Sequence, residues 1–335
     1  MIQNSRNTIN ILEQAVQNGI KRFNNTPIYV QDFQRTVKIF DVTLRDGIQN
    51  LRTNTPVFSP KMKMDIIDKL ISANIQQIEF GSNVSKQNIQ MRNTQELVSS
   101  FDKINSNNKL QLCLLVPNYK KCIETFKWEG ANRINKYSLI TACSEGFINE
   151  NTKMTFNQNL NQIDKILSNT NNKFRLYVSC CFGCPFEGPT TPTHLDNLNK
   201  IIEKYATKSN VDEIVLSDTI GTYDMSQLDY YIESYKSTRK ISLHIHSTEN
   251  DPNIETIIRK YFSDLISIDT SIGNIGGCPS VEKSKVKPNL STLTVANIIN
   301  NIEEKQIYDI DKIAKLEKFV QCAMCNVQLK PRIKN

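Results

Sequence analysis

Residues 213–246 read EIVLSDTIGTYDMSQLDYYIESYKSTRKISLHIH, and their pattern indicates the fold class. A short β-branched run, Glu213–Ser217, is followed by a polar turn and by a segment with helical spacing at 224–238. Asp224 is expected to cap this helix, because aspartate is a favoured N-cap residue. A second β-branched run, Ile241–His246, comes next. Strand, helix and strand in series are the unit of a parallel α/β fold.

The same alternation extends along most of the chain. Eight predicted strands cover Val37–Val42, Ile75–Phe80, Leu110–Val116, Ile134–Ile140, Phe174–Cys180, Glu213–Ser217, Ile241–His246 and Leu265–Asp269. Helix-like segments lie at roughly 60–73, 87–102, 119–128, 152–169, 192–207, 224–238, 251–262 and 293–304, with Thr152 as a further expected N-cap. Eight strand-helix units in series predict a (β/α)8 TIM barrel. A doubly wound open sheet is the alternative, but no G-x-G-x-x-G follows the first strand.

The chain of 335 residues has room for one large barrel. We expect the barrel to occupy residues 37–305 and residues 306–335 to add a helical extension that packs on it. Residues 1–36 form an N-terminal arm, which is loosely amphipathic and carries more basic than acidic side chains. This arm is an ordinary helix, a frayed arm or a cleavable transit peptide.

Composition excludes several classes of protein. Hydrophobic residues make up 39% of the chain, which is enough for a sizeable core and excludes wholesale disorder. No apolar run approaches eighteen residues, so we expect no membrane span. The net charge is 41 basic minus 34 acidic residues, or +7, and it is dispersed. This pattern argues against a nucleic-acid partner, whereas a phosphate-bearing small molecule suits it.

Nine cysteines indicate a reducing compartment, because their number is odd and no disulfide framework is visible. We therefore expect an intracellular, cytoplasmic protein, or a mitochondrial one if the arm is a transit peptide. Two C-x-x-C pairs, Cys181/Cys184 and Cys322/Cys325, leave a shared zinc site open. Three other cysteines are expected to fill the core: Cys113, Cys122 and Cys143.

Barrel active sites form at the carboxyl ends of the strands, so polar residues there are candidates. The first strand runs into Arg45 and Asp46, followed by a turn glycine. The seventh strand carries two of the three histidines, His244 and His246. Residues i and i+2 of a strand point to the same side, so both imidazoles are expected at the barrel mouth. Two imidazoles on one face favour a metal site over a hydrogen-bonded core pair.

Other strand ends supply further polar groups. Glu79 follows an apolar run and is either functional or paired with a base such as Arg45. The sixth strand ends in Ser217–Gly221, which adds Asp218 and Thr219 to the same rim. A glycine-rich stretch, 273–279, has the composition of a mobile lid. Its Cys278 is either an acid–base group or an inert buried thiol.

The donors of this rim are oxygen and nitrogen atoms, which favour Mg²⁺ or Mn²⁺ over Zn²⁺. Such an ion polarises substrate oxygens, and an adjacent arginine stabilises an enolate-like charge. The predicted chemistry is therefore the cleavage or formation of a carbon–carbon bond beside a carbonyl group.

Several short motifs, in order, resemble the 3-hydroxy-3-methylglutaryl-CoA lyase family of metal-dependent barrel lyases and Claisen-type synthases. The resemblance extends from about residue 37 to the C-terminus. Its markers are Arg45–Asn50, Ile78-Glu79, Val116–Asn118, Ser144–Phe147, Cys181–Gly188, Ser217–Gly221, His244–His246, Gly276–Pro279 and Asn289-Leu290.

The resemblance implies a homodimeric enzyme of leucine degradation and ketone body formation. It would cleave 3-hydroxy-3-methylglutaryl-CoA to acetyl-CoA and acetoacetate by a retro-Claisen reaction. The implied metal ligands are Asp46, His244, His246 and Asn289. The implied catalytic residues are Arg45 for the enolate, Glu79 to orient Arg45, Cys278 for proton transfer, and His244. The implied substrate contacts are Arg45, Thr219 and Asn118.

Departures from the family keep two alternatives open. Thr43-Leu44 replaces the usual Gly-Pro and favours a synthase that condenses acetyl-CoA with a 2-oxo acid, like isopropylmalate or homocitrate synthase. Changes around the metal ligands, at Ser247–Asn250 and Leu293-Thr294, allow a catalytically silent barrel that acts as a binding protein. The retained ligands and Arg45 favour the lyase.

Overall fold

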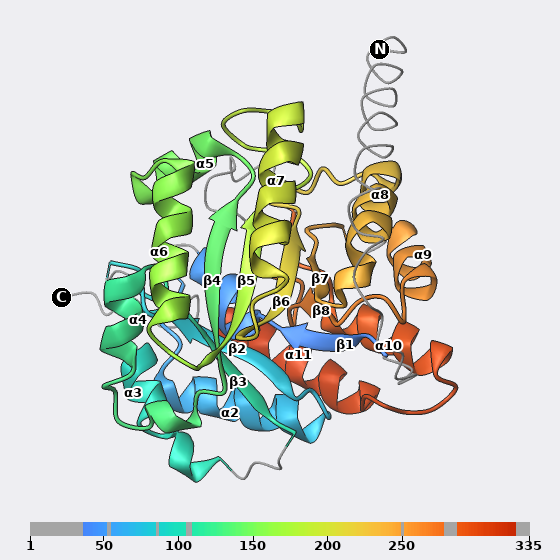
Figure 1. Ribbon diagram of the computed structural model, residues 1–335. Coiled ribbons are helices and arrows are strands. Elements are labelled where there is room, and N and C mark those ends of the chain that lie inside the picture. Colours follow the sequence, from blue (N-terminus) through green and yellow to red (C-terminus); the bar gives the residue numbers. More distant parts are fainter. Residues whose placement is uncertain are drawn as a thin grey trace, which may run out of the picture.

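The computed structural model describes residues 36–51, 55–84, 87–104, 109–248, 251–277 and 287–325. Eight parallel strands pair in sequence order and close into a barrel, because β1 also pairs with β8 (Figure 1). The strands are β1 (Lys38–Asp41), β2 (Gln77–Ser82), β3 (Gln111–Leu115), β4 (Lys136–Ala142), β5 (Lys173–Ser179), β6 (Val211–Ser217), β7 (Ile241–His244) and β8 (Ser267–Thr270). The predicted TIM barrel is thereby confirmed.

Helices surround this barrel on the outside (Figure 1). They are α2 (Pro60–Ser72), α3 (Thr94–Val98), α4 (Tyr119–Thr125), α5 (Glu145–Thr152), α6 (Phe156–Ser168), α7 (Pro192–Tyr205), α8 (Met225–Tyr235), α9 (Asn253–Lys260), α10 (Thr292–Ile302) and α11 (Ile310–Cys325). The last of them, α11, packs against α2 and α10. The predicted arm, residues 1–36, lies outside the described residues except for its last position.

Two predicted helices are wrong in their bounds. Only α3 is an α-helix within the expected segment 87–102, because side chains there bond to the backbone: Gln90 accepts a hydrogen bond from the Phe58 amide. The expected segment 152–169 begins instead at α6, and Thr155 rather than Thr152 is its N-cap. Thr155 forms a capping box, and Lys153 ends α5 in the left-handed region at φ 58°.

The barrel interior holds charged side chains. Arg175, on β5, is fully buried, and its Nε lies 3.0 Å from Glu213 Oε2. Its other two guanidinium nitrogens bond to the carboxylate of Asp269. Glu213 also accepts a hydrogen bond of 2.6 Å from Lys136 Nζ, and the guanidinium carbon lies 3.8 Å from the ring centroid of Phe40. The buried cations and anions therefore balance one another, which burial of charge requires.

The balance predicts a large stability effect at Arg175. Replacing it with methionine (Arg175→Met) leaves two buried carboxylates short of a cation, so the free energy of unfolding should fall by about 3–5 kcal/mol. A matched control, Lys236→Met, removes an ion pair with Glu233 that is largely exposed to solvent, and it should cost under about 1 kcal/mol. Urea denaturation of the metal-free protein measures both values. Equal losses in the two variants would contradict the buried balance.

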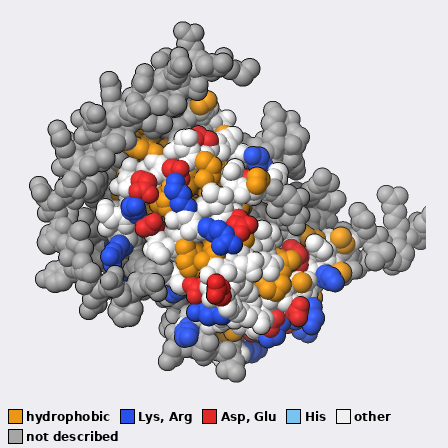
Figure 2. Space-filling view, turned by 90° about the vertical axis from the view of Figure 1, so that its right-hand side faces the viewer, with side chains coloured by type: hydrophobic (Ala, Val, Ile, Leu, Met, Phe, Trp, Pro, Cys, Tyr) orange, Lys and Arg blue, Asp and Glu red, His pale blue; other side chains and the backbone are white. Residues whose placement is uncertain are grey.

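The described surface adds two observations. On the face that Figure 2 shows, acidic and basic side chains of the described residues are interspersed rather than gathered by sign. Ion pairs such as Lys260–Asp229 and Arg259–Glu255 bring opposite charges together on α8 and α9. Among the described residues, the helices are all too short or too polar to cross a bilayer.

Candidate active site

Arg45 and Asp46 lie on a π-helical turn, Thr43–Gly47, that follows β1. The Arg45 Nε donates to Glu79 Oε2 at 2.5 Å, and its Nη1 donates to Asp46 Oδ1 at 2.6 Å. Burial would lower the pKa of Arg45, but Glu79 and Asp46 raise it well above its usual value. Arg45 is therefore a permanent cation on this turn. Of the two alternatives for Glu79, the structure shows its pairing with Arg45.

The two histidines converge on Asp46. Strand β7 ends at His244, and His246 forms an isolated bridge with Asn289. The two Nε2 atoms are 3.1 Å apart. One ligand atom each from Asp46, His244 and His246 fits within a span of 4.8 Å, and this is the one such group of three among the described residues. The predicted common direction of the two imidazoles thus holds in the structure.

Electrostatics leave Asp46 and His246 in the forms that bind metals. Burial would raise the pKa of Asp46, but Arg45 and the two histidines lower it to about 2. Burial, together with His244, lowers the pKa of His246 to about 4. A carboxylate and a neutral imidazole are therefore present at neutral pH, and both are metal-ligand forms.

Asn289 supplies a further test of metal binding. Its Nδ2 donates to Asp46 Oδ2 at 2.9 Å, whereas its buried Oδ1 has no hydrogen-bond partner. An unpaired buried carbonyl oxygen is costly unless a cation or a donor meets it. The 3.1 Å between the histidine Nε2 atoms also matches neighbouring ligands about an octahedral ion, which lie about 3.0 Å apart for bonds of about 2.1 Å. The residues therefore fit a divalent cation.

Sequence reasoning missed two residues that support this group. The Asp269 Oδ2 lies 3.0 Å from His244 Nδ1, a contact that orients the ring and leaves Nε2 for an ion. The Tyr177 hydroxyl lies 2.9 Å from the same oxygen and 3.1 Å from Glu79 Oε2. The Tyr177 hydroxyl thus links Glu79, which holds Arg45, to Asp269, which holds His244. A carboxylate within the apolar eighth strand was the available signal for Asp269.

The backbone of Gly276 packs closely against two of these ligands. A Cβ there would lie 2.1 Å from Asn289 Nδ2 and 3.1 Å from Asp46 Oδ2, and its φ is +107°. We expect Gly276→Ala to push both groups apart and to weaken Mn²⁺ binding at least about tenfold. Gly188→Ala is the matched control, since Gly188 also has a positive φ but open space around it. Titration calorimetry checks this, and equal Mn²⁺ affinity in both variants would contradict the close packing.

The other described residues that were predicted at the rim bond to the backbone of nearby loops and helices. Thr219 Oγ1 accepts a hydrogen bond from the Cys180 amide, and Asn118 caps α4. Asp218 accepts from the backbone amide of Thr222, and burial raises its pKa to about 6. These contacts hold the loops of the rim, and the substrate roles of Thr219 and Asn118 stay predictions. Cys278 lies outside the described residues.

The described cysteines do not join the group at the rim. Cys113, Cys122 and Cys143 are buried, as expected. Of the two C-x-x-C pairs, Cys181/Cys184 is buried and Cys322/Cys325 is exposed on α11. A shared zinc site would require the four thiols to lie together. One pair is buried and the other is exposed, and among the described residues no metal-ligand group contains a cysteine.

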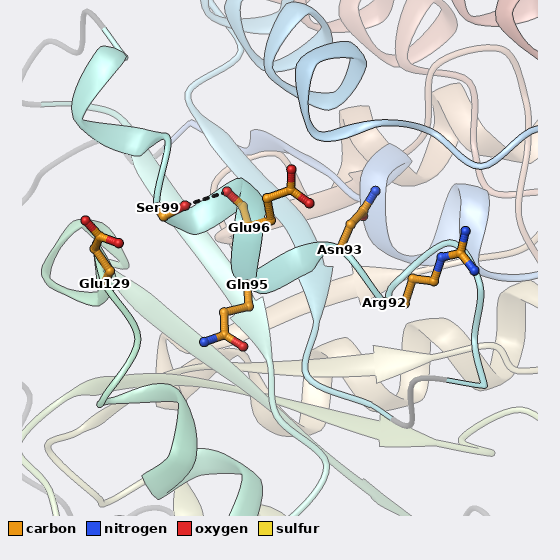
Figure 3. A pocket seen from close by; sticks show the side chains of 6 residues that line it. All are labelled: Arg92, Asn93, Gln95, Glu96, Ser99 and Glu129. Carbon is orange, nitrogen blue, oxygen red and sulfur yellow. Dashed lines mark hydrogen bonds between the residues drawn. The ribbon is translucent and has the colours of Figure 1, made fainter.

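A polar pocket of about 470 Å³ lies around α3 (Figure 3). Its lining comprises Arg92, Asn93, Gln95, Glu96, Ser99 and Glu129. None of these residues belongs to the group formed by Asp46 and the two histidines. We therefore place the chemistry at the barrel mouth rather than in this pocket.

A closed parallel barrel with two imidazoles, a carboxylate and a buried arginine at its rim defines a class of metal-binding barrels. The chain belongs to the HMGL-like family, which matches residues 36–250. This confirms the family resemblance seen in the sequence.

Individual relatives are distant but cover most of the chain. The (R)-citramalyl-CoA lyase of Chloroflexus aurantiacus is 26% identical over 72% of this chain and 77% of its own length. The mitochondrial hydroxymethylglutaryl-CoA lyase of Macaca fascicularis is 26% identical over 85% of each chain. The crystal structure of hydroxymethylglutaryl-CoA lyase from Pseudomonas aeruginosa is 23% identical, with a TM-score of 0.73 over 91% of this chain and 97% of its own. The structural likeness shows the fold.

Proposed function

We propose that the chain is a divalent-metal-dependent carbon–carbon lyase that acts on a CoA thioester. The observation that carries this proposal is the convergence of Asp46, His244 and His246 beside the buried cation Arg45. The relatives named above are all lyases, and their names identify two different CoA thioesters. We propose 3-hydroxy-3-methylglutaryl-CoA as the substrate, with acetyl-CoA and acetoacetate as products.

The residues present suit such a cleavage. Mg²⁺ or Mn²⁺ held by Asp46, His244, His246 and Asn289 would polarise the substrate's hydroxyl group and lower its pKa. As the carbon–carbon bond breaks, its electron pair passes to the thioester as an enolate, and the hydroxyl proton leaves to a base at the mouth. Arg45 is fixed in position by its two carboxylate partners, so it stabilises the enolate oxygen without reorganising.

In this proposal Glu79 is a positioning residue and His244 is a metal ligand. Glu79 holds the Arg45 guanidinium by its Nε and Asp46 holds it by Nη1, so the orientation of the group is fixed. His244 is bonded to Asp269 through Nδ1, so its other nitrogen, Nε2, would serve as a ligand rather than as a base. Cys278 is proposed to protonate the enolate carbon, and Thr219 and Asn118 to contact the substrate.

A coupled acetoacetate assay tests the proposal. Protein treated with EDTA and then supplied with Mg²⁺ or Mn²⁺ should cleave 3-hydroxy-3-methylglutaryl-CoA, whereas protein left with EDTA should not. Condensation of acetyl-CoA with a 2-oxo acid would instead identify a synthase. A metal-induced rise in Tm without turnover of any thioester would identify a silent barrel.

Three broader expectations follow from this substrate and stay predictions. They are a role in leucine degradation and ketone body formation, a homodimer, and a reducing compartment. Light scattering at several protein concentrations measures the oligomeric state. Immunofluorescence of the full-length chain distinguishes the cytoplasm from mitochondria.

A further inference from the structure

One apolar side chain of β4 faces the inside of the barrel at the level of the rim. Lys136 and Ser138 both point inward, since Lys136 bonds to the interior Glu213 and Ser138 Oγ lies 3.0 Å from Cys113 Sγ. Alternate residues of a strand share a face. Ile140, two positions further on, therefore also points into the barrel.

The pairing of β4 with β5 fixes the height of Ile140. Its Cα partner is Tyr177, and neighbouring residues in a parallel ladder project to the same side about 4.8 Å apart. Tyr177 is in the site: its ring centroid lies 5.7 Å from that of His244, and the Arg45 guanidinium carbon lies 5.0 Å from the Tyr177 centroid. Ile140 is therefore a direct neighbour of Tyr177, which contacts both Arg45 and His244.

Ile140 is also exposed, although the residue below it is not. Its side chain is 38% exposed, whereas Ser138 is fully buried. Among the described residues, one other large hydrophobic side chain is as exposed, Phe186, and it lies on the loop after β5, where its ring packs near Phe147. Side chains normally fill the inside of an eight-stranded barrel. An exposed isoleucine there faces open space at the mouth.

The rest of the nearby wall is polar or charged. The groups around Tyr177 are Arg45, His244 and Glu79. A ligand bound there can satisfy these groups with oxygen atoms alone. Ile140 favours a hydrocarbon group instead, because removing its apolar surface from water is favourable.

We infer that Ile140 is a specificity-determining residue, and that it contacts the alkyl substituent on the carbon that bears the substrate's hydroxyl group. This inference rests on the proposed function. A hydroxyl-bearing carbon that also carries an alkyl group presents its oxygens to the polar wall and its alkyl group to Ile140. The preferred substrate class is therefore CoA thioesters with a tertiary hydroxyl carbon, and the size of residue 140 limits the alkyl group.

Three thioesters test this inference: 3-hydroxyglutaryl-CoA, its 3-methyl derivative and its 3-ethyl derivative. We expect the protein to prefer the methyl compound in kcat/KM. Ile140→Ala should raise the ethyl-to-methyl ratio of kcat/KM at least about tenfold, because one methylene in an apolar pocket is worth a factor of 10–200. Ile140→Val should give a smaller change in the same direction, and Phe186→Ala should leave the ratio within about twofold.

Two further measurements separate this inference from the proposed function. Mn²⁺ affinity should be unchanged in Ile140→Ala, since isoleucine supplies no ligand atom. Dissociation constants of the three thioesters, measured by calorimetry with Mn²⁺ present, give the same comparison without turnover. If the protein binds the thioesters but cleaves none, the proposed function fails, and the ratio of dissociation constants still decides the role of Ile140. An unchanged ethyl-to-methyl ratio in Ile140→Ala, or no binding of any thioester, would overturn the inference.

Discussion

Asp46→Asn is expected to weaken Mn²⁺ binding by more than about 100-fold and to abolish metal-stimulated turnover. Changes to residues that only support a metal ligand already cost about 10–100-fold in affinity. Asp46 is the one carboxylate of the group, and Arg45 with the two histidines keeps it ionised. An asparagine has the same shape but no charge to offer the ion. Titration calorimetry with Mn²⁺ and the acetoacetate assay measure the two effects.

Asp102→Asn is the matched control for this variant, because Asp102 is an exposed aspartate on a 3-10 turn at Phe101–Lys103. It should retain both Mn²⁺ affinity and turnover. The metal-free Asp46→Asn protein should still unfold cooperatively. Unchanged Mn²⁺ affinity in Asp46→Asn would place the ion elsewhere and remove the basis of the proposed function.

Arg45→Ala is expected to lower kcat about 10³-fold, while Mn²⁺ affinity stays within about tenfold. Loss of one preorganised donor to a developing oxyanion costs about 10²–10³ in rate, and Arg45 brings a full charge as well. Its contacts are to Glu79 and Asp46, and its role in the proposal is to meet the enolate rather than the ion. Steady-state kinetics and Mn²⁺ titration of one preparation check both values.

The surface variant Arg92→Ala is the control for arginine loss, because Arg92 is exposed beside α3 (Figure 3). Its turnover should equal that of the unmodified protein. If Arg45→Ala loses Mn²⁺ in proportion to its activity, the guanidinium supports the metal ligands and not the enolate. Full turnover in Arg45→Ala would exclude any catalytic part for this side chain.

The fold was predictable because each strand and helix carries its own local pattern. The eight β-branched runs and the capping residue Asp224 are short-range signals, and the structure places both as expected. The errors came from contacts that local patterns do not contain. Gln90 bonds to Phe58, which is distant in sequence, and the left-handed Lys153 ends α5 at the point where the expected helix was to begin.

The site was predictable to the extent that strand ends meet in a closed barrel. That rule predicts from the sequence alone that Asp46 and the two histidines meet at the barrel mouth. It could not identify Asp269 or Tyr177 as supports, because their contacts depend on which face of the barrel each side chain occupies and on its reach. Nor could the rule find Gly276, which matters because a side chain there would collide with Asn289 and Asp46.

Asp269 gives one carboxyl group two tasks, since it neutralises Arg175 and aims His244. Many barrels could exchange interior ions for hydrocarbon and lose nothing, because well-packed apolar residues often serve as well as a buried ion pair. Here, replacing Asp269 with an apolar residue would remove the contact that orients the His244 imidazole. Apolar substitutions inside this barrel that raise its thermal stability should therefore weaken metal binding. Engineered stability and metal affinity would then oppose each other.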